Sequence, residues 1–277
     1  MRLVQQQMAD AKEQEPVAIY HRRMPVSLER MVENALDWEH LPWLHSSSFE
    51  TIRVLSADAD HWRARSRLTG AGEETLLELR LHPDRMGWAT RTLEGAGAGT
   101  LIDSRVVVHG EREIEVSVEF HVPGLATREQ KEVVGSLYLE LYEKLYDEDE
   151  SMMVGRQMRL DERRAANREI DALGKLEDLR ARLPLTIGTS RGPFRLLEVD
   201  DRIRIHSAIC PHSLGPLEDP PCAEDNGDWT VRCPWHGYRF DLDTGASREG
   251  KALKLAKPPE LAVDDDGEVR LRWPGGR

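Results

Sequence analysis

The feature that most constrains this chain is a group of two cysteines and two histidines in its last third. Cys210 and His212 are spaced C-x-H, and Cys233 and His236 are spaced C-x2-H, so each short segment offers one thiolate and one imidazole. Such soft donors bind zinc or an iron–sulfur cluster, although structural zinc sites usually pair Cys with Cys and His with His. The third cysteine, Cys222, lies between the two pairs, and we expect it to be a loop thiol and not a ligand. The sequence therefore predicts a metal centre held by two loops.

The residues around the second pair narrow the choice of metal. The segment Cys233–Asp241, CPWHGYRFD, with Thr244 and Gly245 after it, resembles the Rieske domain of Rieske non-haem iron oxygenases and the related Rieske ferredoxins. That resemblance implies a [2Fe–2S] cluster in which two His replace two Cys on one iron, with the four residues above as ligands. Respiratory Rieske proteins carry an extra Cys in each loop, and the matching positions here are Gly215 and Trp235, so the disulfide of those proteins is not expected.

A second constellation lies near the N-terminus, in the segment 34–45, NALDWEHLPWLH. Two His with a carboxylate are the donors of a mononuclear Fe(II) site that leaves positions open for O₂ and substrate. The segment resembles the N-x2-3-D-x2-H-x4-H motif in the catalytic domain of Rieske oxygenases. The resemblance implies that His40 and His45 bind iron and that Asp37 carries electrons between cluster and iron. Asn34 stands near the Asn of the motif, but a polar residue on an outer helix face explains it equally well.

The third iron ligand implied by the resemblance is an Asp far downstream on a long helix, where four acidic residues follow one another. Helical angles place Asp147 and Glu150 away from the apolar stripe, so we expect them to be solvated, while Glu148 and Asp149 are equally close to the buried face. In the family an acidic pair precedes a Gln by about two turns, which matches Asp149 with Gln157. We therefore predict Asp149 as the ligand, with Glu148 second. The alternative is a charge run that frays the helix into solvent.

The predicted fold class is α+β. Alternating apolar and polar residues predict strands that short turn segments connect into antiparallel hairpins, and a strand and a helix with Ser27 as its N-cap precede them. The expected strands are 17–23, 50–57, 60–68, 74–82, 86–93, 99–108 and 112–122, and the expected first helix is 27–36.

A long helix is predicted over 127–158, with a mostly apolar stripe that includes Val134, Leu137, Tyr138 and Leu141. This order resembles the helix-grip (START-like) fold, in which an antiparallel sheet wraps a C-terminal helix and leaves a cavity. We expect Trp38, Trp43, Trp88 and either Met152 or Met153 to line that cavity. A charged linker helix is expected over about 160–181, and a small all-β Rieske domain after it. The expected domains are 1–175, catalytic with its linker helix, and 176–277, Rieske.

Composition limits the partners. The formal net charge is −12, which argues against binding to nucleic acid. The first residues have no apolar core of a signal sequence, and no stretch has the roughly 20 apolar residues of a membrane helix, so we expect a cytoplasmic protein without membrane contact.

The resemblance implies the oxygenase component of a Rieske system. A flavin or ferredoxin reductase would supply electrons, and the iron would use O₂ to hydroxylate, dihydroxylate or demethylate a small organic molecule, in a homo-oligomer such as the family's trimer. One departure is large, because the family places its Rieske domain first and this chain places it last. Two alternatives stay open. One is a non-enzymatic electron-transfer or redox-sensing protein with a hydrophobic-ligand domain, and the other is an iron enzyme that performs desaturation or ring closure.

Overall fold

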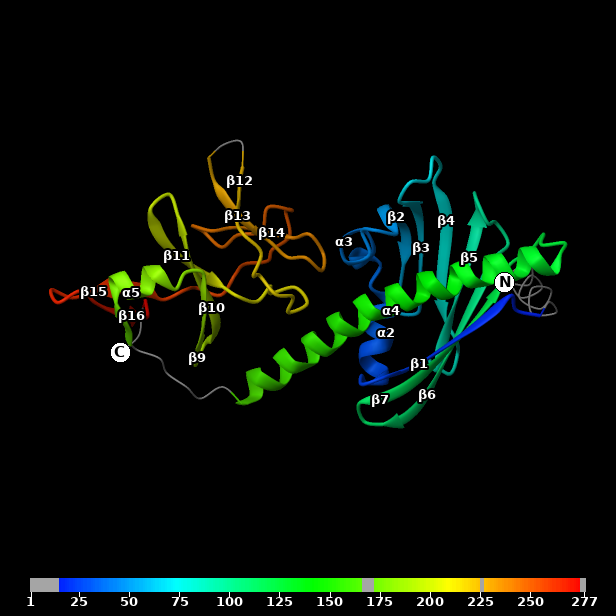
Figure 1. The fold of residues 1–277 in the computed structure, drawn as a ribbon, viewed down its shortest axis with the longest axis horizontal. Helices are drawn as coiled ribbons and strands as arrows, with labels where there is room; N and C mark the ends of the chain where they lie inside the picture. Colours follow the sequence, from blue (N-terminus) through cyan, green and yellow to red (C-terminus); the bar gives the residue numbers. More distant parts are fainter. Residues whose placement is uncertain (1–14, 166–171, 225–226, 275–277) are drawn as a thin grey trace. The chain divides into compact units, whose positions relative to one another are not determined.

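The computed structural model describes residues 15–165, 172–224 and 227–274. By their contacts the residues form two compact units, Met1–Val154 and Gly155–Arg277 (Figure 1). The division falls within one long helix, and the domain boundary expected after residue 175 stays a prediction. No helix in the described ranges combines the length and the apolar character needed to cross a membrane.

The first unit is built on one seven-stranded antiparallel sheet with the order β1-β7-β6-β5-β4-β3-β2. The consecutive strands β2 to β7 pair as hairpins, and β1 pairs with β7 at one edge of the sheet. The strands are β1 (Ala18–Met24), β2 (Phe49–Ala57), β3 (His61–Leu68), β4 (Thr75–Leu81), β5 (Gly87–Glu94), β6 (Leu101–Gly110) and β7 (Glu113–His121). Their observed ends lie at most two residues from the predicted ones. Buried side chains alternate most clearly along β3 and β7, as the sequence pattern predicted. The predicted α+β class is confirmed.

The connection from β1 to β2 contains three short helical segments. Helix α2 (Leu28–Leu36) begins at Ser27, whose hydroxyl oxygen accepts a hydrogen bond from the backbone N–H of Arg30 at 3.3 Å. This N-cap is the one predicted from the sequence. The 3₁₀ helix η1 (Trp38–His40) and the four-residue helix α3 (Leu41–Leu44) follow, and they present the second half of the predicted iron motif.

Helix α4 (Arg128–Ala165) runs across one face of this sheet (Figure 1). Phe120 of β7 is fully buried, and its ring lies 4.9 Å from that of Tyr138 and 4.7 Å from that of Tyr142, measured between centroids. Aromatic pairs at these distances add packing energy beyond the area they bury. The predicted apolar stripe is wrong at Leu137, which is 61% exposed, because the tyrosines and not the leucine turn toward the sheet. A sheet that holds one long helix is the helix-grip arrangement expected from the sequence.

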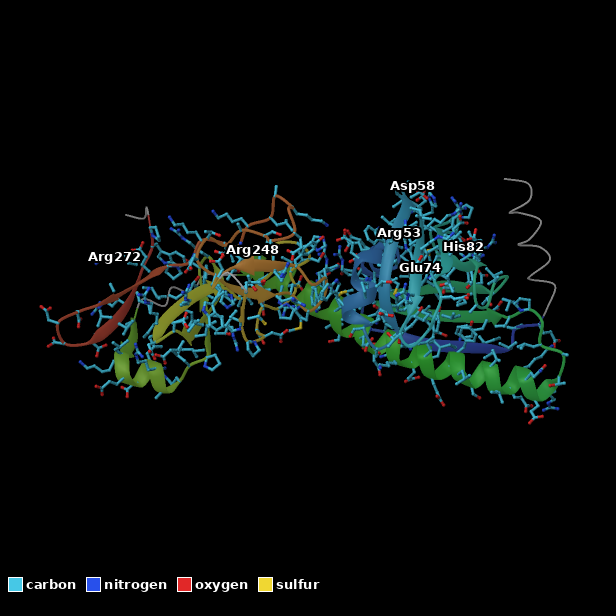
Figure 2. The ribbon with its side chains drawn as sticks, turned by 90° about the horizontal axis from the view of Figure 1, so that it is seen from above. Arg53, Asp58, Glu74, His82, Arg248 and Arg272 are labelled. Carbon is cyan, nitrogen blue, oxygen red and sulfur yellow. The ribbon has the colours of Figure 1, made fainter. Side chains whose placement is uncertain are left out.

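The other face of the sheet is polar. Charged side chains of neighbouring strands pair across it, as Arg63 does with Glu78 at 2.6 Å and Arg65 with Glu94 at 2.7 Å. Figure 2 shows Arg53 on the side of this unit away from α4. The sheet therefore buries the face that α4 covers, and any internal site must lie between them.

The second unit is mostly β-structure in three small antiparallel sheets, with the orders β11-β10-β9, β12-β13-β14 and β15-β16-β8. Its elements after α4 are β8 (Ala172–Lys175), α5 (Leu176–Ala181), β9 (Leu185–Thr189), β10 (Gly192–Val199), β11 (Arg202–Ser207), β12 (Cys222–Ala223), β13 (Trp229–Arg232), β14 (Arg239–Asp241), β15 (Glu260–Val263) and β16 (Glu268–Arg272). Phe194, Leu196 and Val269 are among its fully buried core residues.

The linker helix predicted over 160–181 is wrong in its second half. Residues 172–175 form β8, which pairs with β16 far along the chain, and only 176–181 is helical. Pairing with a distant strand overrides the local helix propensity. Residues 166–171 of that prediction lie outside the described residues.

Candidate functional site

The two predicted iron-binding histidines flank the short helix α3. His40 precedes the helix and His45 follows it, with the His45 backbone N–H donating to Leu41 O at 3.2 Å. Both imidazoles are buried, with relative exposures of 3% and 1%. Their ring centroids lie 5.0 Å apart at an interplanar angle of 73°. One tight helical turn thus aims two imidazoles at the same point.

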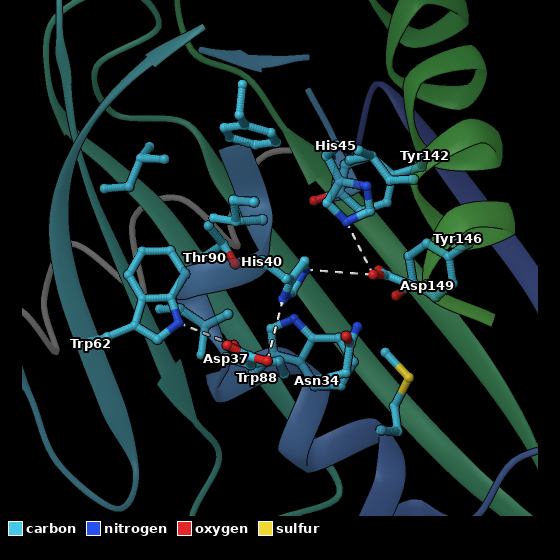
Figure 3. A pocket seen from close by; sticks show the side chains of 17 residues that line it. Asn34, Asp37, His40, His45, Trp62, Trp88, Thr90, Tyr142, Tyr146 and Asp149 are labelled. Carbon is cyan, nitrogen blue, oxygen red and sulfur yellow. Dashed lines mark hydrogen bonds and ion pairs between the residues drawn. The ribbon is translucent and has the colours of Figure 1, made fainter. Parts of the chain in front are cut away.

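Asp149 of α4 meets both rings at that point (Figure 3). Its Oδ1 lies 3.0 Å from His45 Nε2 and 3.5 Å from His40 Nε2, and the residue is 8% exposed. One donor atom from each of the three residues lies within 4.8 Å of the others. The structure therefore brings together the three residues that the sequence predicted as iron ligands.

Each imidazole also has a carboxylate near its other nitrogen. Glu148 Oε2 lies 2.6 Å from His45 Nδ1, and Asp37 Oδ2 lies 3.9 Å from His40 Nδ1. Burial lowers the pKa of His45, but the hydrogen bonds and charges of Asp149 and Glu148 outweigh burial and raise the pKa above its usual value. Carboxylates at the site thus stabilise positive charge there.

The sequence predicted the other two acids, Asp147 and Glu150, to be solvated. The Asp147 side chain is exposed, at 61%, whereas that of Glu150 is only 25% exposed. Arg22 of β1 contacts both, at 2.6 Å from Asp147 Oδ1 and 2.8 Å from Glu150 Oε2. The four consecutive acids therefore divide into an outer pair that binds Arg22 and an inner pair that meets the histidines. The charge run does not fray the helix.

A cavity of about 130 Å³ opens at the three ligand residues. Its walls are mainly apolar and include Trp62, Trp88, Leu77 and Leu79. Asn34 also lines it, and its buried Oδ1 makes no hydrogen bond within the described part of the chain. The cavity gives a small apolar chamber with a polar group at the metal-binding end.

The predicted lining residues are only partly correct. Trp88 lines the cavity, whereas Trp38, Trp43, Met152 and Met153 are absent from the lining that the described residues form. Trp43 is 42% exposed, and Met153 is packed in the core at 2% exposure.

Four aromatic residues of the lining were missed by sequence reasoning: Phe49, Trp62, Tyr142 and Tyr146. Trp62 lies on β3, where the apolar side of the alternation already marked it as inward-facing, and its Nε1 donates to Ala35 O at 3.0 Å. Tyr142 and Tyr146 lie on α4 at helical spacing four and eight residues after Tyr138. That spacing was visible in the sequence but was not used.

The donor set fits a mononuclear divalent iron. Two neutral imidazoles and one carboxylate are the donors of non-haem Fe(II) sites, and all three side chains are buried around one point. Burying a carboxylate is costly unless a cation or hydrogen bonds compensate it.

The predicted cluster ligands lie in two loops of the second unit. The first loop closes where Cys210 N–H donates to Gly215 O at 2.9 Å, and the second where Cys233 N–H donates to Tyr238 O at 2.9 Å. The rings of His212 and His236 stand edge to face, 4.5 Å apart between centroids. The structure therefore brings the paired loops and both imidazoles together.

The two thiols fit an iron–sulfur cluster. Both are buried, at 0% and 1% exposure, and a hydrogen bond between them raises the pKa of Cys210 and lowers that of Cys233. Backbone N–H groups of His212 and Ser213 donate to the first sulfur, and those of Trp235 and His236 donate to the second. Such donors stabilise thiolate charge.

Close packing holds the two loops against each other. A Cβ added at Gly215 would lie 2.6 Å from Cys233 Sγ and 3.1 Å from the Trp235 ring. Gly215 and Trp235 are the two positions that were matched in the sequence with the extra cysteines of respiratory Rieske proteins. Cys222, the remaining cysteine, is exposed in β12.

Residues 170–259 match the family model of the Rieske [2Fe–2S] domain. A search of curated proteins finds no match. Among solved structures, a protein of Thermus thermophilus is 19% identical with a TM-score of 0.40, over 50% of this chain and 96% of that chain. The quaternary ammonium Rieske monooxygenase CntA is 9% identical with a TM-score of 0.40, over 52% and 40%. The ferredoxin of carbazole 1,9a-dioxygenase from Nocardioides aromaticivorans is 20% identical with a TM-score of 0.28, over 37% and 98%.

The family model bears out the predicted Rieske domain. It supports a [2Fe–2S] cluster in the C-terminal part of the chain and implies iron–sulfur electron transfer there.

Proposed function

We propose that this chain is the oxygenase component of a Rieske system, with a mononuclear iron held by His40, His45 and Asp149. The observation that carries the proposal is that three buried donors meet at the end of an apolar cavity, in a chain that also contains a Rieske domain. A Rieske cluster moves electrons but has no open position for a substrate. The second site supplies what the cluster lacks.

When bound, non-haem Fe(II) with open positions supplies O₂ activation. The protein's part is to hold that ion with three side chains and to leave the cavity side clear. Asp37 is proposed to carry electrons toward the site, since its carboxylate lies near His40 Nδ1 and its side chain is 26% exposed. A reductase or ferredoxin supplies the electrons to the [2Fe–2S] cluster.

The cavity supports a compact, largely apolar organic substrate. An engineered cavity of about 150 Å³ in another protein binds one benzene molecule, so a cavity of about 130 Å³ accommodates roughly one ring. Trp62 and Trp88 exclude water from the substrate, and Asn34 Oδ1 can accept a hydrogen bond from it. Hydroxylation, dihydroxylation and oxidative demethylation all remain within this proposal.

Iron counting tests the proposal. The purified holoprotein should contain about three iron atoms per chain, two in the cluster and one at the histidine site. Asp149→Ala and His40→Ala should each lose about one iron while the Rieske absorption and circular dichroism stay unchanged. Both should abolish substrate-dependent O₂ consumption with a reductase.

The outcome also separates the competing functions. About two irons in the wild type would refute the oxygenase and support an electron carrier with a ligand-binding domain. Three irons with turnover but no incorporation of labelled oxygen into product would support desaturation or ring closure. Light scattering on the same sample checks the proposed homo-oligomer.

A further inference from the structure

The two inner acids of α4 contact opposite sides of the same imidazole. Asp149 Oδ1 lies 3.0 Å from His45 Nε2, on the side where the other donors meet. Glu148 Oε2 lies 2.6 Å from His45 Nδ1, on the far side of the ring. A carboxylate behind the ring cannot share an ion with Nε2 without displacing the histidine.

This placement assigns different tasks to the two acids. If Nδ1–H donates to Glu148, a neutral His45 carries its lone pair on Nε2, the nitrogen that faces Asp149. Carboxylates that accept the remote N–H of a metal-binding histidine fix its tautomer and ring orientation and raise its basicity. For His40 the matching carboxylate oxygen, on Asp37, is 3.9 Å away, which is beyond hydrogen-bond length.

We propose that Glu148 is a positioning residue that fixes His45 for metal binding and is not itself a ligand. The inference rests on the proposed iron site. It replaces the sequence-based ranking, which treated Glu148 and Asp149 as competitors for one task, with a division of labour between them.

The two outer acids of α4 contact the neighbouring strand β1. Arg22 of β1 contacts Asp147 and Glu150 on the neighbouring positions of the helix. Burial alone would lower the pKa of Arg22. Its hydrogen bonds to Tyr20, Asp147 and Glu150 outweigh burial and raise the pKa above its usual value, so the guanidinium stays charged. The outer pair thus contacts β1 while the inner pair faces the histidines.

Two substitutions at one position test the inference. Glu148→Ala removes the acceptor, and Fe(II) affinity, measured anaerobically against a competing chelator, should fall by about 10- to 100-fold. Glu148→Gln keeps a carbonyl oxygen that can accept the Nδ1–H, so it should recover most of that affinity. Glu140→Ala, an exposed acid on the same helix, is the matched control and should leave the affinity unchanged.

A spectroscopic signature separates positioning from general damage. With nitric oxide as the probe, the ferrous site gives an EPR signal to which the oxidised Rieske cluster does not contribute. Glu148→Ala should retain this signal at saturating Fe(II) with altered rhombicity, because His45 is still a ligand but is less firmly oriented. Glu148→Gln should restore the wild-type signal.

The failures are distinguishable. A wild type without the third iron overturns the proposed function and this inference together. If the wild type binds iron and Glu148→Ala binds it equally well, the inference alone is wrong. If Glu148→Ala abolishes binding as Asp149→Ala does, and Gln does not restore it, then Glu148 is a ligand and the inference is also wrong.

Discussion

Gly215 offers a sharp test of how the two cluster loops pack. Its φ lies outside the positive range that favours glycine, so alanine meets no backbone strain there. In an open position a Gly→Ala change of this kind stabilises a protein by about 0.4–1 kcal/mol, because the unfolded chain loses freedom. Here, however, the added methyl would lie 2.6 Å from Cys233 Sγ, so we expect Gly215→Ala to destabilise the protein.

The size of the effect follows from that distance. Ordinary contacts of a Cβ begin at 3.4 Å, so the loops must separate by about 0.8 Å at a point where both carry predicted cluster ligands. Overpacking of a buried contact costs about 1–3 kcal/mol. At about 4 °C per kcal/mol, Gly215→Ala should melt roughly 4–12 °C below the wild type.

The assay is cluster content together with thermal unfolding. We expect Gly215→Ala to contain less iron and acid-labile sulfide per chain and to lose part of the Rieske circular dichroism. Gly188→Ala is the matched control, because nothing lies within 4 Å of the added Cβ and its φ is also outside the positive range. A Gly215→Ala protein with a full cluster and the melting temperature of the control would refute the packing argument.

Three further predictions concern single side chains. Phe120→Ala should destabilise the first unit by about 3–5 kcal/mol in urea unfolding, because it empties a fully buried aromatic site. Val107→Ala, at an exposed position of β6, should have little effect. Burial raises the pKa of Asp241, but bonds from Thr244 and Arg248 outweigh burial and lower it, so its stabilising effect is present above the unfolded-state pKa and is lost as pH falls through the folded-state pKa. In urea unfolding, the stability gap between wild type and Asp241→Asn should therefore stay nearly constant from pH 7 to about pH 5 and narrow only as pH falls below about 4. Lys251 lies 4.6 Å over the Tyr238 ring, which packs on both cluster histidines, so Lys251→Met should lower the cluster's reduction potential in a titration followed by circular dichroism, and an unchanged potential would contradict that role.

The large sheet could be predicted closely because each strand carries its own signal. Alternation along β3 marks Trp62 and Ala64 as buried, and turn residues mark where the strands end. The four-residue β8 carries no such signal. It forms because its backbone pairs with Val269 and its neighbours on β16, and no pattern in the local sequence predicts this pairing.

The candidate site was predictable in its residues but not in their roles. Spacing and resemblance indicated His40, His45 and Asp149, which the structure brings within 4.8 Å of one another. Periodicity could not separate Glu148 from Asp149, because both lie at similar angles to the buried face. Side-chain direction decides between them, and it depends on where the rings of His40 and His45 point, about a hundred residues earlier in the chain.

His45 and Asp149 are 104 positions apart in the sequence, and this separation links metal binding to the stability of the folded chain. An ion bound by both residues would link the segment before β2 to helix α4. The unfolded chain does not hold the two residues together, so it lacks this site. The ion's binding energy therefore adds to folding, by about 2.7 kcal/mol when free ion exceeds the dissociation constant a hundredfold. Iron scarcity would then shorten the lifetime of this chain against proteases, independently of any effect on turnover.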